Sequence, residues 1–198
     1  MSIHTFGDSH SSNIISGWNK NIKSHHLGPI LCYSFGKDHL KRCDIRNYNI
    51  KNNDTLIFCF GELDCRCHVN KHITNEITYQ TIIENLIENY VNAIKKNISK
   101  VNIKLKNICI YNVVPPIKKE NIYRDSKYPC IGTNEERKSY VLYFNQLAKQ
   151  KCIENDWIFF DIYDKYTTKD GFLEHKYSDG NIHIYDGKYI NEFIQKYL

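Results

Sequence analysis

The sequence predicts an α/β fold, a three-layer α/β/α sandwich whose central, mostly parallel sheet has five strands. Two observations predict it. Short apolar runs alternate along the whole chain with longer amphipathic segments, and no repeat, low-complexity tract or linker interrupts the alternation. Strands that alternate with helices of this length need crossover connections, which make neighbouring strands parallel. Because 198 residues are enough for one hydrophobic core, we expect a single domain over residues 1–198.

Five apolar runs are expected to form the strands. They span Ile3–Phe6, Ile30–Ser34, Thr55–Phe60, Ile108–Val114 and Trp157–Ile162. The third is the clearest, because an unbroken apolar run is what a central parallel strand, buried on both faces, needs. The second run is entered through Gly28-Pro29, and Pro115-Pro116 stop the fourth.

Three amphipathic segments are expected to form helices. They span Thr78–Ser99, residues 134–154 and Lys188–Leu198. In each, apolar residues recur at the spacing of one helical face. Thr133 and Glu136 have the spacing of a capping box, which fits a start of the second helix near residue 134.

The composition argues against a nucleic-acid or membrane partner. The net charge of +5 comes from lysines spread along the chain, whereas nucleic-acid binding needs a concentrated basic face. No stretch reaches the roughly 20 apolar residues of a membrane helix, and Met1–Phe6 lacks the layout of a signal peptide. We therefore expect a cytoplasmic protein. Cys32, Cys59 and Cys109 lie in apolar runs, so most of the eight cysteines are expected to be free thiols.

Chemistry-bearing residues follow several of the expected strands. In parallel sheets the functional groups gather at the carboxyl ends of the strands, which here carry Ser9, Gly36, residues 62–66 and the loop after Pro116. A serine becomes a nucleophile when a rigid turn exposes it beside a base, and Gly7-Asp8-Ser9 directly after a strand offers such a turn. Taken alone, the same tripeptide is also a common helix cap.

A base and an acid lie near the other end of the chain. Asp179 and His183 precede the last helix and are close enough in sequence for one loop to present both. A nucleophilic serine needs an imidazole, and that imidazole usually needs a carboxylate on its other nitrogen. A solvated surface histidine is the alternative interpretation of this loop.

A third group follows the clearest strand. Glu62, Asp64 and Arg66 come directly after Gly61, and charged groups at the end of a buried strand are costly unless they are paired or used. They form either a structural ion-pair network or part of a site, and their place in a loop favours the site.

Together these segments resemble the SGNH (GDSL-type) hydrolase superfamily, and the resemblance covers order and spacing along essentially the whole chain. Gly7, Asp8 and Ser9 match the family's first block. Gly36 is the best candidate for the glycine after strand two, with Gly28 as its rival. Gly61 and Asp64 match the ends of the third block, Gly-x-Asn-Asp. Asp179 and His183 stand for the last block, Asp-x-x-His.

The resemblance implies a flavodoxin-like sheet and a hydrolase of acyl esters, without cofactor or metal, acting on a small molecule or a glycan. The substrate class that the resemblance implies is an acylated, often acetylated, sugar. In that family, the first-block serine attacks, the histidine moves the proton and the aspartate orients the histidine. These roles would fall to Ser9, His183 and Asp179. The backbone N–H groups of Ser9 and Gly36 would hold the oxyanion. The remaining expected site residues are Asp8, Glu62, Asp64 and Arg66.

Two departures from the family pattern leave alternatives open. Leu63 stands where the family has an asparagine that donates to the oxyanion, and Asp179 and His183 are separated by one residue too many. A non-catalytic carbohydrate-binding or assembly protein, with a decayed oxyanion hole, is the first alternative. The second is an acyltransferase that passes the acyl group to a sugar hydroxyl.

A zinc site is a further alternative. Cys65, Cys67, His68 and His72 have residue types that suit zinc. They lie within eight residues, however, which leaves no room for two separated ligand pairs, so we expect no metal.

Overall fold

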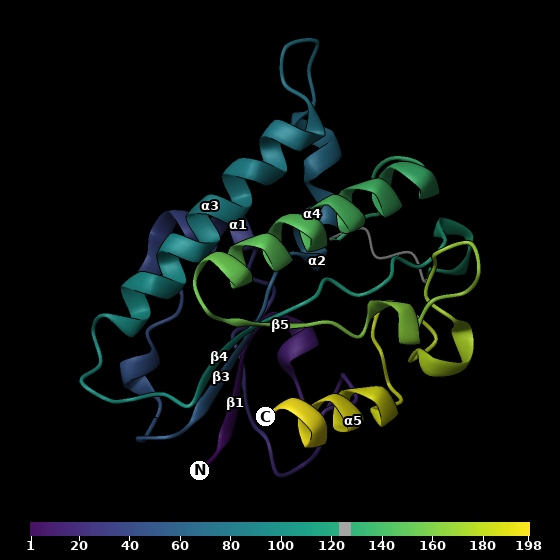
Figure 1. The fold of residues 1–198 in the computed structure, drawn as a ribbon. Helices are drawn as coiled ribbons and strands as arrows, with labels where there is room; N and C mark the ends of the chain where they lie inside the picture. Colours follow the sequence, from purple (N-terminus) through teal and green to yellow (C-terminus); the bar gives the residue numbers. More distant parts are fainter. Residues whose placement is uncertain (123–127) are drawn as a thin grey trace.

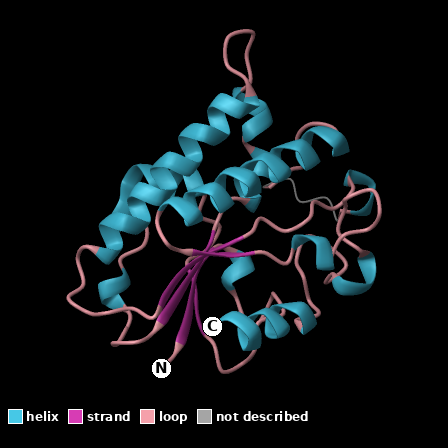
Figure 2. Ribbon diagram, viewed as in Figure 1, coloured by secondary structure: helices cyan, strands magenta, loops and turns pink. Residues whose placement is uncertain are grey.

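The computed structural model describes residues 1–122 and 128–198. Part of the loop after Pro116, one of the expected functional segments, therefore lies outside the described residues. The strands, drawn magenta in Figure 2, form one parallel sheet. Their order in the sheet is β2-β1-β3-β4-β5. They are β1 (Ile3–Gly7), β2 (Lys23–His26), β3 (Thr55–Cys59), β4 (Asn107–Tyr111) and β5 (Ile158–Phe160). The five-stranded α/β sandwich is confirmed, and the strand order is that of flavodoxin-like sheets.

Helices cover both faces of this sheet (Figure 1). They are α1 (Cys32–Asp38), α2 (Glu62–Cys67), α3 (Tyr79–Ile98), α4 (Asn134–Glu154) and α5 (Lys188–Tyr197). Helices α1, α3 and α4 pack on one face, and α5 lies on the other. Within the described residues, no helix has the length and apolar character needed to cross a membrane.

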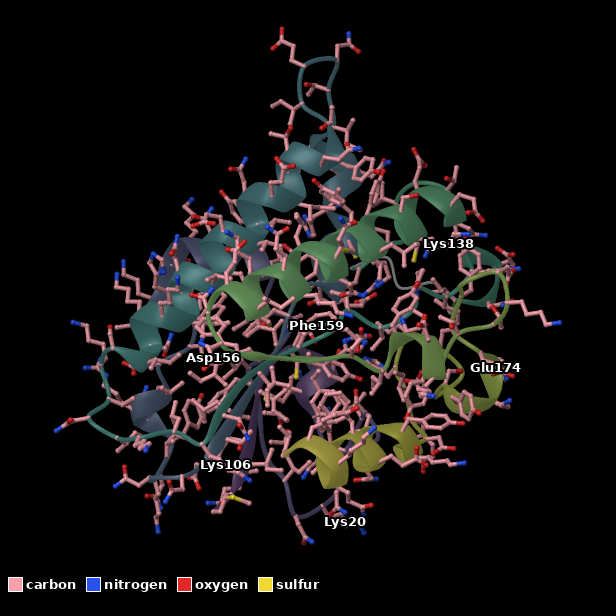
Figure 3. The ribbon with its side chains drawn as sticks, viewed as in Figure 1. Lys20, Lys106, Lys138, Asp156, Phe159 and Glu174 are labelled. Carbon is pink, nitrogen blue, oxygen red and sulfur yellow. The ribbon has the colours of Figure 1, made fainter. Side chains whose placement is uncertain are left out.

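Strand β3 divides its side chains between the two layers of the core. Leu56 and Phe58 pack into the cluster under α3 and α4, whereas Ile57 and Cys59 pack into the cluster beside α5. All four are at most 1% exposed, as the alternation of a strand covered on both faces requires. Figure 3 shows side chains filling the space between sheet and helices, with Phe159 between β5 and α4.

The capping residues set the starts of the two long helices. The Thr133 side chain accepts the backbone N–H of Glu136, and the Glu136 carboxylate accepts the backbone N–H of Thr133 at 2.7 Å. This is the capping box expected from the sequence, and α4 spans residues 134–154 as expected. Thr78 caps α3 by accepting the backbone N–H of Thr81.

The second expected strand is wrong. Residues 32–38 form α1, and the second strand is the polar segment Lys23–His26, which pairs with β1 alone at the edge of the sheet. The Asp64 carboxylate accepts the backbone N–H groups of Cys32 at 2.7 Å and Tyr33 at 3.1 Å. The first backbone N–H groups of a helix have no partner within the helix. Asp64, which is 31 or more residues away in sequence, accepts two of them and so favours a helix in this apolar run.

Candidate active site

The site lies where the strand order reverses, between β1 and β3. The chain leaves these two neighbouring strands toward opposite faces of the sheet, and this opens a crevice at their carboxyl ends. Gly7 ends β1 with φ +157°, and a Cβ there would lie 1.9 Å from the carbonyl oxygen of Cys59 on β3. Only glycine allows this approach. Asp8 then caps the short 3-10 helix Ser9–Ser11, accepting the backbone N–H of His10 at 2.9 Å, and this turn presents Ser9 at the crevice.

The loop before α5 brings a histidine and an acid to Ser9. The Nε2 atom of His183 lies 2.8 Å from the Ser9 Oγ, and its Nδ1 atom lies 2.7 Å from the Asp179 Oδ2. The side chains of His183 and Asp179 are 14% and 25% exposed, so water reaches the acid and only part of the ring. This is the arrangement in which a neutral imidazole can remove the hydroxyl proton and a carboxylate can steady the cation that forms.

Ser9 and His183 face a cavity of about 410 Å³, within the range of sites for small molecules. Its lining mixes charged, amide and apolar groups. The lining residues are Asp8, Ser9, His26, Pro29, Glu62, Leu63, Arg66, Ile122, Tyr128, Asn181, Ile182 and His183. Among the described residues, the Asn181 Oδ1 is buried without a hydrogen-bond partner, so the cavity wall offers an unused acceptor. The cavity therefore suits a compact ligand with both hydroxyl and apolar faces.

Glu62 and Arg66 form a bidentate pair on the wall of this cavity. The Arg66 Nε lies 2.6 Å from the Glu62 Oε1, and its Nη2 lies 3.2 Å from Oε2. Burial by itself raises the pKa of Glu62, but the charges of Arg66 and His10 outweigh it and lower the pKa. The remaining arm of Arg66 donates to the carbonyl oxygen of Tyr128. Arg66 therefore lines the cavity and also forms an ion pair, and its part in a site stays a prediction.

Asp64 has a structural position instead of a place in the cavity. It is 1% exposed, caps the start of α1 and does not line the wall around Ser9. Burial raises its pKa to about 7, against the effect of the two backbone N–H groups that it accepts. The adjacent Leu63 does line the cavity, so an apolar side chain stands beside the nucleophile.

The structure also corrects the expected position of Gly36. It lies inside α1, where a Cβ would come within 2.9 Å of the Asn89 Cβ on α3. Its small size therefore serves helix packing, and it does not line the cavity. Gly28 fits the required position, because the true second strand ends at His26 just before it. Gly28 does not line the cavity itself, but Pro29 directly after it and His26 two residues before it do.

Two backbone donors remain unused at the crevice. Within residues 1–122 and 128–198, neither the N–H of Ser9 nor that of Gly28 has a hydrogen-bond partner. Gly28 has φ +85°, a left-handed conformation that favours glycine. The sequence analysis kept Gly28 only as the rival of Gly36, because it placed the second strand after Gly28.

His10 is a further site residue that the sequence analysis missed. Its ring centroid lies 4.9 Å from that of His183, and its side chain is only 5% exposed. Burial lowers the pKa of His183, and the neighbouring His10 lowers it further, so His183 favours its neutral, basic form. The only signal in the sequence was the position of His10 directly after the candidate serine.

The residues of the zinc alternative divide between two environments. Cys65 and Cys67 are buried on α2, and burial raises the pKa of both thiols, which disfavours the thiolate that zinc binds. His68 and His72 line a separate cavity of about 630 Å³ that contains neither Ser9 nor His183. Across the described residues, no group of three or more His, Cys, Asp or Glu is arranged to hold a metal ion.

No family model matches the sequence, and no curated protein is detectably similar to it. Solved structures are similar in fold. A Streptococcus pneumonia protein described as a platelet activating factor has 16% identity and a TM-score of 0.67, covering 99% of this chain and 83% of its own. A GDSL-like lipase from Bacteroides thetaiotaomicron has 10% identity and a TM-score of 0.65, and the match covers 98% of this chain and 86% of the lipase. A carbohydrate acetylesterase from Sinorhizobium meliloti has 14% identity and a TM-score of 0.57, and the match covers 100% of this chain and 99% of the acetylesterase.

The sheet order and the structural similarities define the class of the fold as an α/β sandwich with a crevice at the reversal of strand order. More particularly, the fold is that of the SGNH (GDSL-type) hydrolases, as the sequence blocks indicated.

Proposed function

We propose that this protein is a serine hydrolase that cleaves acyl esters, with acetyl esters of a carbohydrate as its substrate class. The observation that carries the proposal is the continuous chain from Asp179 through His183 to Ser9, with contacts of 2.7 and 2.8 Å. The fold neighbours include a GDSL-like lipase and a carbohydrate acetylesterase, which supports ester chemistry and the carbohydrate.

In the proposed reaction, the Ser9 Oγ attacks the ester carbonyl carbon while the His183 Nε2 takes the hydroxyl proton. The resulting imidazolium is stabilised by Asp179 and gives the proton to the departing alcohol, leaving an acyl-enzyme. Water then attacks the acyl carbon and gives a proton to His183. The proton returns to Ser9 as the carboxylic acid leaves.

The oxyanion is proposed to be bound by the backbone N–H groups of Ser9 and Gly28. Both are free of other partners in the described part of the chain. Leu63 supplies no third donor, and one such donor is typically worth about 2.7–4 kcal/mol in the transition state. The chain is therefore expected to be a slow esterase on simple esters unless Arg66 takes that role.

Two properties of the cavity support a sugar. Polar groups that can pair with hydroxyls, including Asn181 and the Glu62–Arg66 pair, alternate with apolar groups such as Pro29 and Ile182. Its volume of about 410 Å³ suits a single acylated ring better than a long acyl chain.

The test is covalent labelling followed by substrate profiling. A fluorophosphonate probe should label Ser9, located by peptide mass spectrometry, and acetylated sugars should be hydrolysed faster than long-chain lipid esters. His183→Gln should abolish labelling, because it removes the base. A folded protein that never reacts with the probe would refute the hydrolase.

That negative result would favour the non-catalytic alternative, to which Leu63 in the nucleophile's cavity already points. The binding of unacylated sugars by calorimetry would then test a carbohydrate-binding role. Analysis of products with free sugar acceptors separates hydrolysis from acyl transfer.

A further inference from the structure

His10 occupies a buried position between the two halves of the site. Its Nδ1 lies 3.1 Å from the Asp8 Oδ1, and its Nε2 lies 3.3 Å from the carbonyl oxygen of Ile182. Asp8 belongs to the turn that presents Ser9, and Ile182 directly precedes His183. The ring therefore connects the segment that carries the nucleophile with the segment that carries the base.

Both ring nitrogens of His10 face acceptors. A carbonyl oxygen can only accept, and an ionised carboxylate can only accept, whereas a neutral imidazole carries a single N–H. Both contacts are satisfied together only when His10 is an imidazolium. Burial by itself lowers the pKa of His10, but the hydrogen bond and charge of Asp8, helped by the charge of Glu62, outweigh burial and raise it.

A cation at this position acts directly on His183. The two ring centroids are 4.9 Å apart, so a second positive charge on His183 is disfavoured. Asp179 and Glu62 act in the opposite direction, because their negative charges favour protonation of His183. Asp8 and the cation of Arg66 also line the cavity that His183 faces, and each is already paired, Asp8 with His10 and Arg66 with Glu62. Without the charge of His10, burial would be the main effect opposing the two carboxylates, and His183 would hold a proton at higher pH.

We propose that His10 is a positioning residue that, as an imidazolium paired with Asp8, fixes the loop of His183 against the Ser9 turn and keeps His183 neutral. The inference rests on the proposed function for its catalytic meaning. Its physical content, the protonation states of two histidines, is separate from any activity. At neutral pH the positive charge of His10 leaves the Nε2 lone pair of His183 free to receive the Ser9 proton.

The first test needs no variant. Imidazole ¹⁵N–¹H NMR of the labelled full chain at pH 7 should show His10 protonated on both nitrogens and His183 neutral. A neutral His10 at that pH would overturn the proposal.

The second test removes the charge. In His10→Gln, the titration midpoint of His183 should rise by about 0.5 pH units or more, because a unit charge about 5 Å away is lost. The acid limb of the kcat/KM profile should move to higher pH with it. An unchanged His183 midpoint would overturn the proposal.

His4→Gln is the matched control. His4 is a buried histidine beside an aspartate, with its Nε2 3.2 Å from the Asp54 Oδ2. It lies on β1, the strand that leads to Ser9. The His4→Gln substitution should leave the titration midpoint of His183 unchanged. A shift in this control equal to that in His10→Gln would refute a specific role for His10. If the NMR results hold but no ester is cleaved, the proposed function fails and the inference about the two histidines stands.

Discussion

The Asp179 carboxylate lies 2.7 Å from the His183 Nδ1 although three residues separate them in the chain. Its other oxygen accepts the backbone N–H groups of Asn181 at 2.9 Å and His183 at 3.2 Å. The backbone N–H of Asp179 in turn donates to the carbonyl oxygen of His183, and Gly180 adopts φ +83°. The extra residue is therefore absorbed inside a closed loop, and the acid remains on the imidazole.

Ser9→Ala should abolish ester hydrolysis. The substitution removes the hydroxyl oxygen that forms the acyl-enzyme in the proposed mechanism, while the turn is kept by the Asp8 cap and the Gly7 approach to β3. We expect kcat/KM on a short-chain ester to fall to background and the melting temperature to change little. Wild-type turnover by a clean Ser9→Ala preparation would refute the mechanism.

Leu63→Asn should raise kcat. Leu63 lines the nucleophile's cavity, and it stands where the sequence resemblance implies an asparagine that donates to the oxyanion. One added donor should raise kcat about tenfold or more. The measurement is kcat on one acetyl ester, with Leu63→Ala as the control for the change in size. No gain in a folded Leu63→Asn would indicate that the oxyanion already has its full set of donors, with Arg66 as the candidate.

Arg66→Lys should cost both activity and stability. Lysine keeps the charge but loses the planar fork that holds both Glu62 oxygens. We expect kcat/KM to fall tenfold or more, about 1.4 kcal/mol or above in transition-state energy, together with a lower melting temperature. Unchanged kinetics with a lowered melting temperature would make Arg66 a purely structural residue.

Gly28→Ala and Gly36→Ala should separate the two glycines. At Gly36, an added Cβ meets Asn89, so the melting temperature should fall, by the equivalent of about 1–3 kcal/mol, with kcat/KM retained. At Gly28 the space is open, but φ +85° strains any other residue and should displace the N–H, so kcat should fall. Loss of activity in a well-folded Gly36→Ala would restore the sequence assignment.

The stability of the fold should decrease on the acid side because of His25. Burial lowers its pKa to about 4 from an ordinary 6.5, and the charges of His4 and Lys23 add to the effect. Between pH 4 and pH 6.5 the unfolded chain binds more protons at this histidine than the folded chain does. The contribution of neutral, buried His25 to the free energy of unfolding is therefore complete above pH 6.5 and is lost as the pH falls toward 4. The melting temperature of His25→Gln should fall less over that range than that of the wild type. Parallel curves would contradict the assignment.

The fold was largely predictable because its signals are local. The apolar run Thr55–Phe60 and the capping box of Thr133 and Glu136 depend on neighbours in the chain. The run forms β3 over Thr55–Cys59, and the capping box is present at the start of α4. The edge strand Lys23–His26 gave no such signal, because a half-exposed strand with one neighbour needs no apolar pattern. The apolar run that was assigned as a strand became α1 through the distant carboxylate of Asp64.

By itself, the sequence determined the fold class, because the alternation of apolar runs and amphipathic segments is a local pattern. Ser9, Asp179 and His183 became candidates through the resemblance of their blocks, in order and spacing, to the SGNH family. The tertiary structure decided which residues share the crevice. It placed Glu62 and Arg66 on the cavity wall, Asp64 under α1, Gly36 against α3 and His10 beside the base. These differences follow from packing between segments far apart in sequence, where burial and charge depend on neighbours that no local pattern records.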